Sequence, residues 1–246
     1  MKNQKVALIT GANRGIGFET AKQLGEKGVT VVLGARNLVA AQEAAGKLIA
    51  LGIDAHGIQL DVTKADDRQS AAVYLNQQFG KLDILINNAG VAPKESLFVP
   101  KSSETTAEEF QYIFETNLFS VVFLTNELLP LIRKSEAGRI VNLSSILGSL
   151  TIHAQPDSPI RDYRVLSYNA SKTALNMFTI QLADELKGAG IKVNSAHPGW
   201  VQTELGGNEQ APMNIEDGAK TSVELALIGE DGPTGKFIHL GEELPW

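Results

Sequence analysis

Short apolar runs alternate with longer amphipathic stretches along the whole chain. In the first run, Val6–Ile9, four apolar residues follow one another, which is typical of a strand covered on both faces. Similar runs predict seven strands, which are Lys5–Thr10, Thr30–Ala35, Ala55–Leu60, Leu82–Ile86, Arg139–Leu143, Lys192–Ala196 and Lys236–His239. Helical patterns lie between them, from the first glycine-rich turn to Lys27 and over Asn37–Leu51, Lys64–Phe79, Glu104–Arg133 (in one piece or two), Arg164–Lys187 and Ile215–Ile228. This alternation predicts an α/β fold with one doubly wound, parallel, seven-stranded sheet and helices on both faces.

Three segments do not fit the pattern. Val91–Ser103 contains two prolines and residues 149–164 contain two more, so both are expected to be irregular. Gly206–Pro212 begins with two glycines and is expected to form a mobile lid. No linker or repeat divides the chain, and residues 1–246 are therefore expected to form a single domain.

Composition narrows the classes of function. The 246 residues are 43% hydrophobic and 20% charged, an ordinary balance for a soluble globular protein. The absence of cysteine excludes disulfides, thiolate zinc sites and a Cys nucleophile, and it suits a reducing cytoplasm. The four histidines lack helical metal-ligand spacing, so no metal site is expected. A net charge of −6 without a basic stripe argues against nucleic acid as a partner.

Neither of two apolar regions has the length of a targeting or membrane segment. The run Val6–Ile9 is too short for a signal peptide. The longest apolar region, Phe119–Ile132, is interrupted by Asn126 and Glu127 and is too short to span a bilayer. We therefore expect a cytoplasmic protein without a membrane partner.

A glycine-rich turn follows the first strand. Thr10–Gly17 has its glycines in the spacing G-x-x-x-G-x-G, which differs from the commoner G-x-G-x-x-G dinucleotide fingerprint. Glycines at the end of a strand permit a tight turn and a close approach of phosphate to the start of the next helix. The alternative is a turn with ordinary packing glycines, but the order strand, loop and helix favours phosphate binding. The residues expected to contact a cofactor here are Gly11, Asn13, Arg14, Gly15, Ile16 and Gly17.

The second strand bears on the choice between NAD and NADP. An acidic residue about 20 positions beyond the glycines would bind the ribose 2′-hydroxyl of NAD. That count leads to Ala35-Arg36, and no Asp or Glu occurs between Lys27 and Gln42. Arg36 and Arg14 instead suit a 2′-phosphate, although both arginines are also explained as solvated surface charges. The pattern favours NADP(H) over NAD(H).

Polar residues also end the third and fourth strands. Asp61 and Val62 follow the third strand, at the edge where ligands bind in open α/β sheets. Asp61 is equally explained as the N-cap of the helix Lys64–Phe79. After the fourth strand, Asn87–Gly90 either bonds the backbone of neighbouring strands and leaves room for a flat ligand, or forms a plain turn.

Tyr168 and Lys172 are four residues apart and would share one face of a helix. The free phenol has a pKa of about 10. An ammonium roughly 4 Å away, at an effective dielectric constant of about 20, favours the phenolate by up to about 4 kcal/mol. That effect would bring the phenol to roughly pH 7, where it can exchange protons. A surface tyrosine with a solvated lysine explains the spacing alone equally simply.

Taken together, the motifs resemble the short-chain dehydrogenase/reductase family over essentially the whole chain, and most of all its carbonyl reductase branch. The matching residues are Thr10–Gly17, Asp61, Asn87–Gly90, Asn117, Ser145, Tyr168 with Lys172, and Pro198-Gly199 with Thr203. The carbonyl reductase likeness lies in Ala35-Arg36, Ser144–Ile146, Pro198–Val201 and the segment from Gly232 to Trp246. The resemblance implies a Rossmann fold.

The resemblance also implies roles. Ser145 would hold the substrate carbonyl oxygen, Tyr168 would supply the proton, and Lys172 would lower the tyrosine pKa and bond the nicotinamide ribose. Asn117 would bend its helix and hold a relay water. Further cofactor contacts are implied for Asp61, Val62, Asn88, Ala89, Gly90, Tyr168, Lys172, Pro198, Gly199, Val201 and Thr203, and substrate contacts for Ser145, Ile146, Tyr168 and Trp200.

These residues lead us to expect an NADPH-dependent enzyme that reduces the carbonyl of a ketone, aldehyde or quinone, with a small-molecule carbonyl substrate as its partner. An NAD(P)-dependent alcohol or sugar dehydrogenase is the nearer alternative, and a non-catalytic NADP(H)-binding sensor the more distant one. Ser145 and Tyr168 are 23 residues apart, which is longer than in most of the family and shorter than in the carbonyl reductases. A monomer and a homo-oligomer formed through the helices carrying Asn117 and Tyr168 are therefore both open.

Overall fold

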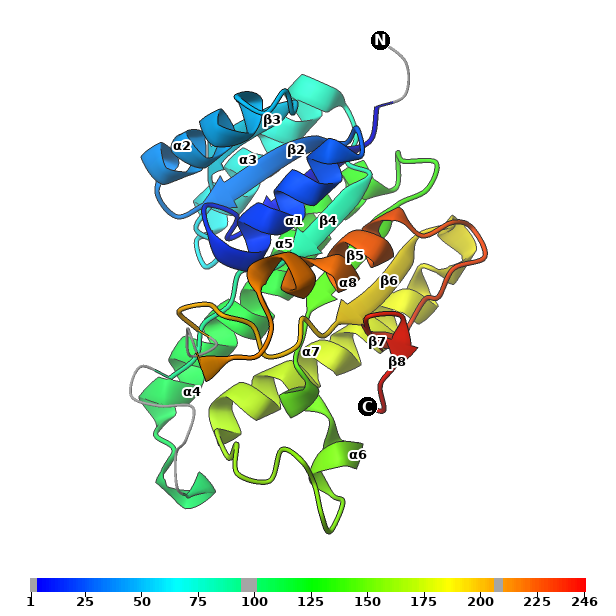
Figure 1. Cartoon of the computed structure of the whole chain (residues 1–246). Helices are drawn as coiled ribbons and strands as arrows, with labels where there is room; N and C mark the ends of the chain where they lie inside the picture. The colour runs from blue at the N-terminus through cyan, green and yellow to red at the C-terminus, as the bar shows by residue number, and fades with distance from the viewer. Residues whose placement is uncertain (1–3, 94–100, 206–209) are drawn as a thin grey trace.

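A single sheet forms the centre of the computed structural model, which describes residues 4–93, 101–205 and 210–246. Its strand order is β3-β2-β1-β4-β5-β6-β7-β8, and all neighbours are parallel except β7 and β8 (Figure 1). The strands are β1 (Val6–Thr10), β2 (Thr30–Ala35), β3 (Ala55–Gln59), β4 (Ile84–Asn87), β5 (Arg139–Leu143), β6 (Lys192–Ala196), β7 (Phe237–His239) and β8 (Glu242–Glu243). The order runs outward from β1 and β4 in opposite directions, which creates a switch point at their carboxyl ends.

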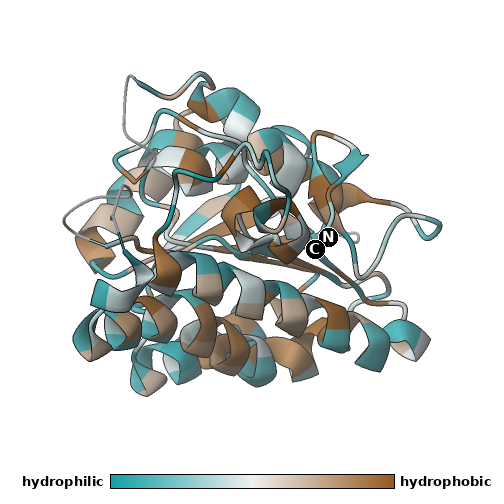
Figure 2. Ribbon diagram, turned by 90° about the horizontal axis from the view of Figure 1, so that it is seen from below, coloured by the Kyte–Doolittle hydropathy of each residue, from teal (hydrophilic) through white to brown (hydrophobic). Residues whose placement is uncertain are grey.

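Helices cover both faces of the sheet. They are α1 (Gly15–Glu26), α2 (Leu38–Ile49), α3 (Ala65–Phe79), α4 (Ala107–Phe114), α5 (Ser120–Ile132), α6 (Leu150–His153), α7 (Leu166–Glu185) and α8 (Ile215–Leu227). On β1, Ala7 and Ile9 pack into the core beneath α1, α2 and α8, while Val6 and Leu8 pack into the core of α3, α5 and α7. In Figure 2 the strands of the sheet are largely hydrophobic in colour, and the helices beside them carry both hydrophobic and hydrophilic segments. The continuous apolar pattern of β1 therefore reflects burial on both faces, as predicted.

The structure confirms the α/β fold and adds one strand. Glu242–Glu243 forms an eighth strand, antiparallel to β7, after a turn at Gly241 with φ of 83°. Two exposed glutamates give no apolar signal, so the sequence pattern did not predict it. The helical region Glu104–Arg133 is divided by a π-helical turn, η2 (Glu115–Phe119), between α4 and α5.

The irregular segments are described only in part. The stretch 149–164 contains the short helix α6 and follows a 3₁₀ turn, η3 (Ile146–Gly148). Residues 94–100 of the predicted loop Val91–Ser103 and residues 206–209 of the predicted lid Gly206–Pro212 lie outside the described residues. Within the described ranges, no helix combines the length and hydropathy needed to cross a membrane.

Candidate active site

A cavity of about 900 Å³ opens at the carboxyl ends of the strands, where the sheet order reverses. This volume lies within the usual range for small-molecule and cofactor sites. The predicted residues that line it are Gly11, Asn13, Arg14, Gly15, Ile16, Gly17, Arg36, Asp61, Val62, Asn88, Ala89, Gly90, Tyr168, Lys172, Pro198 and Thr203. The fold thus brings together residues that are far apart in the sequence, at the position expected for a doubly wound sheet.

The glycine-rich turn needs its glycines for two separate reasons. Gly11 and Gly15 have φ of 64° and 56°, in the left-handed region that other residues rarely adopt. At Gly17, an added Cβ would lie 2.5 Å from Asn88 Nδ2 and 2.6 Å from the Gly11 carbonyl oxygen. Helix α1 begins here without a side-chain hydrogen bond from its N-cap residue Arg14 and without an acidic residue in its first turn. Its positive end therefore faces the cavity, ready for an anion.

Asn88 joins the turn after β4 to the glycine-rich turn. Its Nδ2 donates to the carbonyl oxygens of Thr10 at 2.7 Å and of Gly11 at 3.2 Å. Thr10 Oγ1 in return accepts the backbone N–H groups of Asn88 at 3.0 Å and Ala89 at 2.9 Å. The plain-turn interpretation of Asn87–Gly90 is therefore wrong, and the predicted bonds to the backbone of a neighbouring strand are confirmed for Asn88. The Nδ2 of Asn87 instead donates to the side chains of Thr125 and Asn142.

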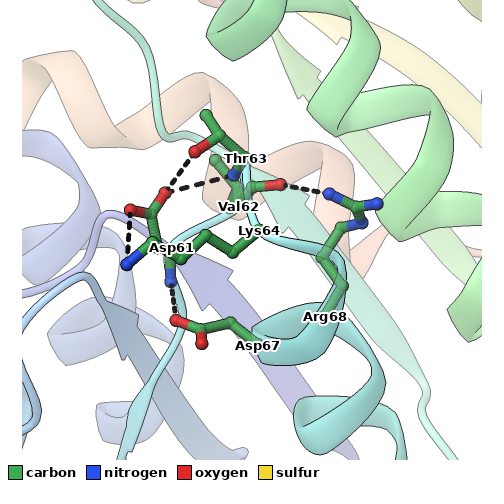
Figure 3. A network of polar contacts seen from close by, with 6 residues as sticks. All are labelled: Asp61, Val62, Thr63, Lys64, Asp67 and Arg68. Carbon is green, nitrogen blue, oxygen red and sulfur yellow. Dashed lines mark hydrogen bonds and ion pairs between the residues drawn. The ribbon is translucent and has the colours of Figure 1, made fainter.

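The third strand ends in a turn that Asp61 organises (Figure 3). Its carboxylate accepts the Thr63 backbone N–H at 3.2 Å and the Thr63 hydroxyl at 2.7 Å, and lies 3.9 Å from Lys64 Nζ. The N-cap residue of α3 is Lys64, so the interpretation of Asp61 as the helix N-cap is wrong. Asp67, inside the first turn of α3, accepts the Asp61 backbone N–H at 2.8 Å. Asp61 and Val62 both line the cavity.

Both arginines predicted to bind a 2′-phosphate lie at the cavity, and Arg14 forms an ion pair there. Arg36 follows β2 and is exposed. Arg14 forms an ion pair with Glu204, with 2.7 Å between Nη1 and Oε1. The two side chains are 64% and 69% exposed, so the pair is open to solvent and easily exchanged.

Tyr168 and Lys172 lie one turn apart on α7 and face the cavity. Both are buried. Lys172 Nζ donates to the Leu143 carbonyl oxygen at 2.8 Å and lies 5.6 Å from the centre of the Tyr168 ring. Ser145, which follows β5, hydrogen-bonds the Tyr168 side chain, and its Oγ accepts the Leu147 N–H at 3.2 Å. Ser145 thus stands beside the phenol, although the residue that lines the cavity here is its neighbour Ser144.

The expected near-neutral tyrosine is wrong for this structure. Burial raises the pKa of Tyr168 to about 12, although the hydrogen bond from Ser145 opposes the shift. Burial also lowers the pKa of Lys172 to about 8. The expectation assumed an ammonium roughly 4 Å from the phenol, whereas here Lys172 Nζ lies 5.6 Å from the ring centre and the loss of hydration dominates. Tyr168 is consequently protonated at neutral pH.

Asn117 lies within the π-helical turn η2 and is buried. The turn agrees with the expected local bend of the helix. Its Oδ1 accepts the Val91 N–H and its Nδ2 donates to the Val91 carbonyl oxygen, both at 2.9 Å. The same Nδ2 lies 3.2 Å from Ser171 Oγ, next to Lys172 in the sequence. Asn117 therefore braces the loop after β4 against α7 from behind the cavity.

Comparison with known proteins agrees with this geometry. Residues 5–214 match the family model described as short chain dehydrogenase. The chain belongs to the short-chain dehydrogenase family. It is 30% identical to carbonyl reductase [NADPH] 1 of Mus musculus over 99% of both chains, and 30% identical to (-)-isopiperitenone reductase of Mentha piperita over 96% of both. The crystal structure of NADPH-bound carbonyl reductase from chicken fatty liver superposes with a TM-score of 0.85 at 26% identity, covering 99% of this chain and 100% of that one.

As a short-chain dehydrogenase, the chain is an oxidoreductase of carbonyl or alcohol groups that uses a nicotinamide dinucleotide. Some residues that the family pattern implies do not line the cavity. At Gly199, φ is 89° and an added Cβ would lie 2.1 Å from Met213 Sδ, so this glycine is required for packing. Val201 is buried, and its Cγ2 would lie 2.6 Å from a Cβ added at Gly218. Their predicted cofactor contacts stay predictions.

The predicted substrate contacts of Ile146 and Trp200 likewise lie outside the cavity lining. Trp200 is 40% exposed and packs edge-on against Tyr163, with 6.2 Å between ring centres. Ile146 is half-buried and donates its N–H to His197 Nδ1 at 3.3 Å. His197 was not singled out in the sequence. Burial and the neighbouring His239 lower its pKa to about 3, so it is neutral and able to accept this bond beside Ser145.

Sequence reasoning also missed part of the lining of this short-chain dehydrogenase. Helix α4 and the turn η2 contribute Gln111, Tyr112, Glu115 and Thr116. These residues form two pairs with helical i, i+4 spacing, so the face that carries them was readable once the helix was placed. Gln202, Glu204 and Leu205 gave no such signal. No cluster of three or more metal-ligating side chains occurs among residues 4–93, 101–205 and 210–246.

Proposed function

We propose that this short-chain dehydrogenase is an NADPH-dependent reductase of carbonyl compounds, with a ketone, aldehyde or quinone as substrate and Tyr168 as the general acid. One observation carries the proposal. Tyr168 and Lys172 line a cavity that also presents Arg36, Ser145 hydrogen-bonds the phenol of Tyr168, and no carboxylate follows β2 where NAD would need one. The mouse relative is a carbonyl reductase [NADPH] and the chicken structure is of an NADPH-bound carbonyl reductase, which supports the same cofactor.

The residues present fit a dinucleotide. The first turn of helix α1 lines the cavity without a side-chain cap, so its N–H groups suit a pyrophosphate. A Cβ added at Gly15 would meet only Thr203, at 3.8 Å, so space remains above the turn. Arg36 and Arg14 would hold the 2′-phosphate through bidentate hydrogen bonds. When bound, the cofactor supplies the hydride.

The chain itself supplies the proton. With its pKa raised to about 12, Tyr168 is protonated at neutral pH and is a donor rather than an acceptor. This state favours carbonyl reduction over alcohol oxidation. Ser145, bonded to the phenol, would donate to the same carbonyl oxygen and stabilise the charge that develops there.

Lys172 and Asn117 have supporting roles in this proposal. An ammonium 5.6 Å from the phenol ring would stabilise the phenolate that remains after proton transfer. Asn117 fixes Val91 and Ser171, which flank the cavity end near Lys172. Its amide is engaged in these bonds, so the relay water implied by the family stays a prediction.

Steady-state kinetics test the proposal against its alternatives. We expect NADPH consumption with at least one member of a panel of aldehydes, ketones, diketones and quinones. We also expect kcat/KM to be higher for NADPH than for NADH. A preference for NADH with faster alcohol or sugar oxidation would instead identify a dehydrogenase. NADPH binding without turnover of any carbonyl would identify a non-catalytic sensor.

A homo-oligomer formed through α5 and α7 is also part of the proposal. The two helices, with the adjoining turn η2, expose apolar side chains: Phe119 is 41%, Phe123 47% and Met177 54% exposed. Water contact with such a surface is unfavourable, and pairing would remove it. Light scattering during size-exclusion chromatography should give a mass above the 26.4 kDa of one chain, and a mass of one chain would establish the monomer.

A further inference from the structure

The turn after β3 lies at the end of the cavity away from Tyr168. Under the proposed function, the 2′-phosphate sits at Arg36, directly after β2. Because β2 pairs with β3, the adenosine half of the cofactor would lie over the ends of these two strands. Asp61, Val62 and Thr63 line this part of the cavity. The inference below concerns what fixes their conformation, and it rests on the proposed function.

Arg68, in the first turn of α3, binds the back of this turn (Figure 3). Its Nη1 donates to the Val62 carbonyl oxygen at 3.0 Å, while its Nε lies 3.2 Å from Glu127 Oε1 on α5. The guanidinium also lies 5.5 Å from the centre of the Phe123 ring. A single side chain thus connects the turn after β3 to a helix that begins at the π-helical turn of Asn117.

Arg68 occupies a position where the fold alone would favour an apolar residue. The buried residues of α3 are Arg68, Ala71 and Leu75, which form the stripe that packs against the sheet and α5. The Arg68 side chain is only 8% exposed, and burying an ion pair there costs hydration that an apolar side chain would not lose. Glu127 Oε2 is buried without a hydrogen-bond partner, so the pair is not optimised for stability either.

We propose that Arg68, held in place by Glu127, is a positioning residue that presets the Asp61–Val62 turn for the adenosine half of the cofactor. Arg68 fixes the carbonyl of Val62, and Asp67 fixes the N–H of Asp61 from the same helix. Both bonds come from helix α3, and Asp61 and Val62 still line the cavity. The turn is then already ordered before a ligand arrives, so binding pays less conformational entropy.

Arg68→Met tests the inference because methionine keeps an unbranched stem beside Phe123 and removes the guanidinium bonds. The probe is 2′,5′-ADP, which carries only the adenosine half with its 2′-phosphate. Loss of one positioning hydrogen bond should raise its Kd by about 3- to 10-fold. KM for NADPH should rise by a similar factor, while kcat at saturating NADPH stays unchanged because the end of the cavity that holds Tyr168 is intact.

Two comparisons separate positioning from general loss of structure. Arg133→Met is the matched control: Arg133, at the C-terminal end of α5, is 47% exposed and pairs with Glu185 at 3.6 Å, away from the cavity. It should leave Kd and KM unchanged. Arg68→Lys keeps the charge, but one ammonium cannot bridge Val62 and Glu127 as the guanidinium does, so a partial rise in Kd is expected.

The outcomes distinguish this inference from the proposed function. If the wild-type protein does not bind 2′,5′-ADP or NADPH, the proposed function itself is wrong. If the wild type binds and Arg68→Met binds equally well, the positioning role is refuted. Should Arg68→Met fail to fold because Glu127, whose side chain is only 27% exposed, is left charged without its partner, the double variant R68M/E127Q removes that charge. An unchanged Kd for this variant, or for Arg68→Lys, would then overturn the inference.

Discussion

Replacing Glu204 with glutamine should strengthen NADPH binding. Glu204 Oε1 lies 2.7 Å from Arg14 Nη1 and so occupies one of the two guanidinium groups proposed to bind the 2′-phosphate. Carboxylate and phosphate compete for the same donors. Glu204→Gln keeps the size of the side chain and removes its charge, so Arg14 becomes available without a change in packing.

The size of the effect follows from the exposure of the pair. Side chains that are 64% and 69% exposed form an ion pair worth about 0.2–1 kcal/mol. Binding the phosphate sacrifices this amount, so its removal should lower the Kd for NADPH by about 1.4- to 5-fold. The Kd for NADH should not change, because NADH has no 2′-phosphate. Salt weakens the exposed pair, and the gain should therefore shrink as ionic strength rises.

Nucleotide fluorescence titrations at low and moderate salt measure these constants. Glu243→Gln is the matched control, because Glu243 also forms an exposed 2.7 Å pair, with Lys236, on β8 rather than at the cavity. A double-mutant cycle with Arg14→Ala sharpens the assay. In the Arg14→Ala background, Glu204→Gln should have no effect on NADPH affinity, since the competition it relieves no longer exists.

The reasoning fails if Glu204→Gln improves NADH and NADPH binding equally, because the effect would then not involve the 2′-phosphate. It fails also if the improvement persists without Arg14. An unchanged Kd in every background would show that Arg14 does not contact the phosphate.

Further predictions concern stability and pH. Gly17→Ala should abolish NADPH binding in a titration, because the added Cβ would lie 2.5 Å from Asn88 Nδ2. Gly46→Ala, whose added Cβ would meet nothing within 4 Å, should raise the free energy of urea unfolding by up to about 1 kcal/mol. Thr10→Val leaves the N–H groups of Asn88 and Ala89 without their acceptor and should lower the free energy of unfolding by about 2–5 kcal/mol, while Thr10→Ser should not; a small loss for the valine variant would contradict this. His197 has its pKa lowered from 6.5 to about 3, so the unfolded chain binds more protons between these values, and stability should fall by about 1.4 kcal/mol per pH unit as the pH drops below 6.5. His197→Asn should remove this fall in the free energy of unfolding, measured by urea unfolding between about pH 4.5 and 7. An unchanged dependence of the free energy on pH would refute the assignment to His197.

The fold was predictable because burial on both faces leaves a direct trace in the sequence. Val6–Ile9 is apolar without interruption, and in the structure its alternate residues enter two different cores. Strand β8 left no such trace, because Glu242 and Glu243 are exposed and pair only through their backbone with β7. The apolar pattern depends on burial, so it cannot predict a strand whose side chains are exposed.

The candidate site was predictable as far as motif residues line the cavity. The glycine-rich turn, Asp61 and Tyr168 with Lys172 meet there as expected. The direction of the tyrosine pKa was not predictable, since helical spacing gives a neighbour but not the loss of hydration around it. The spacing of a motif therefore indicates which residues meet at the site better than it indicates their pKa values.

Contacts between distant segments were also beyond the sequence. Arg14 and Glu204 are 190 positions apart, and Arg68 and Glu127 are 59 apart. Nothing in the sequence indicates that the two members of either pair meet. Only the folded chain shows that one pair lies at the cavity and that the other contacts the turn after β3.

The most direct test of the central claim is NADPH oxidation by wild-type protein and Tyr168→Phe, measured with the most active carbonyl of the panel. Phenylalanine removes the proton and keeps the buried ring, so kcat should fall by about 100- to 10,000-fold while the Kd for NADPH stays the same. Such a result would establish Tyr168 as the acid of a working reductase. Retained turnover in Tyr168→Phe would contradict the account.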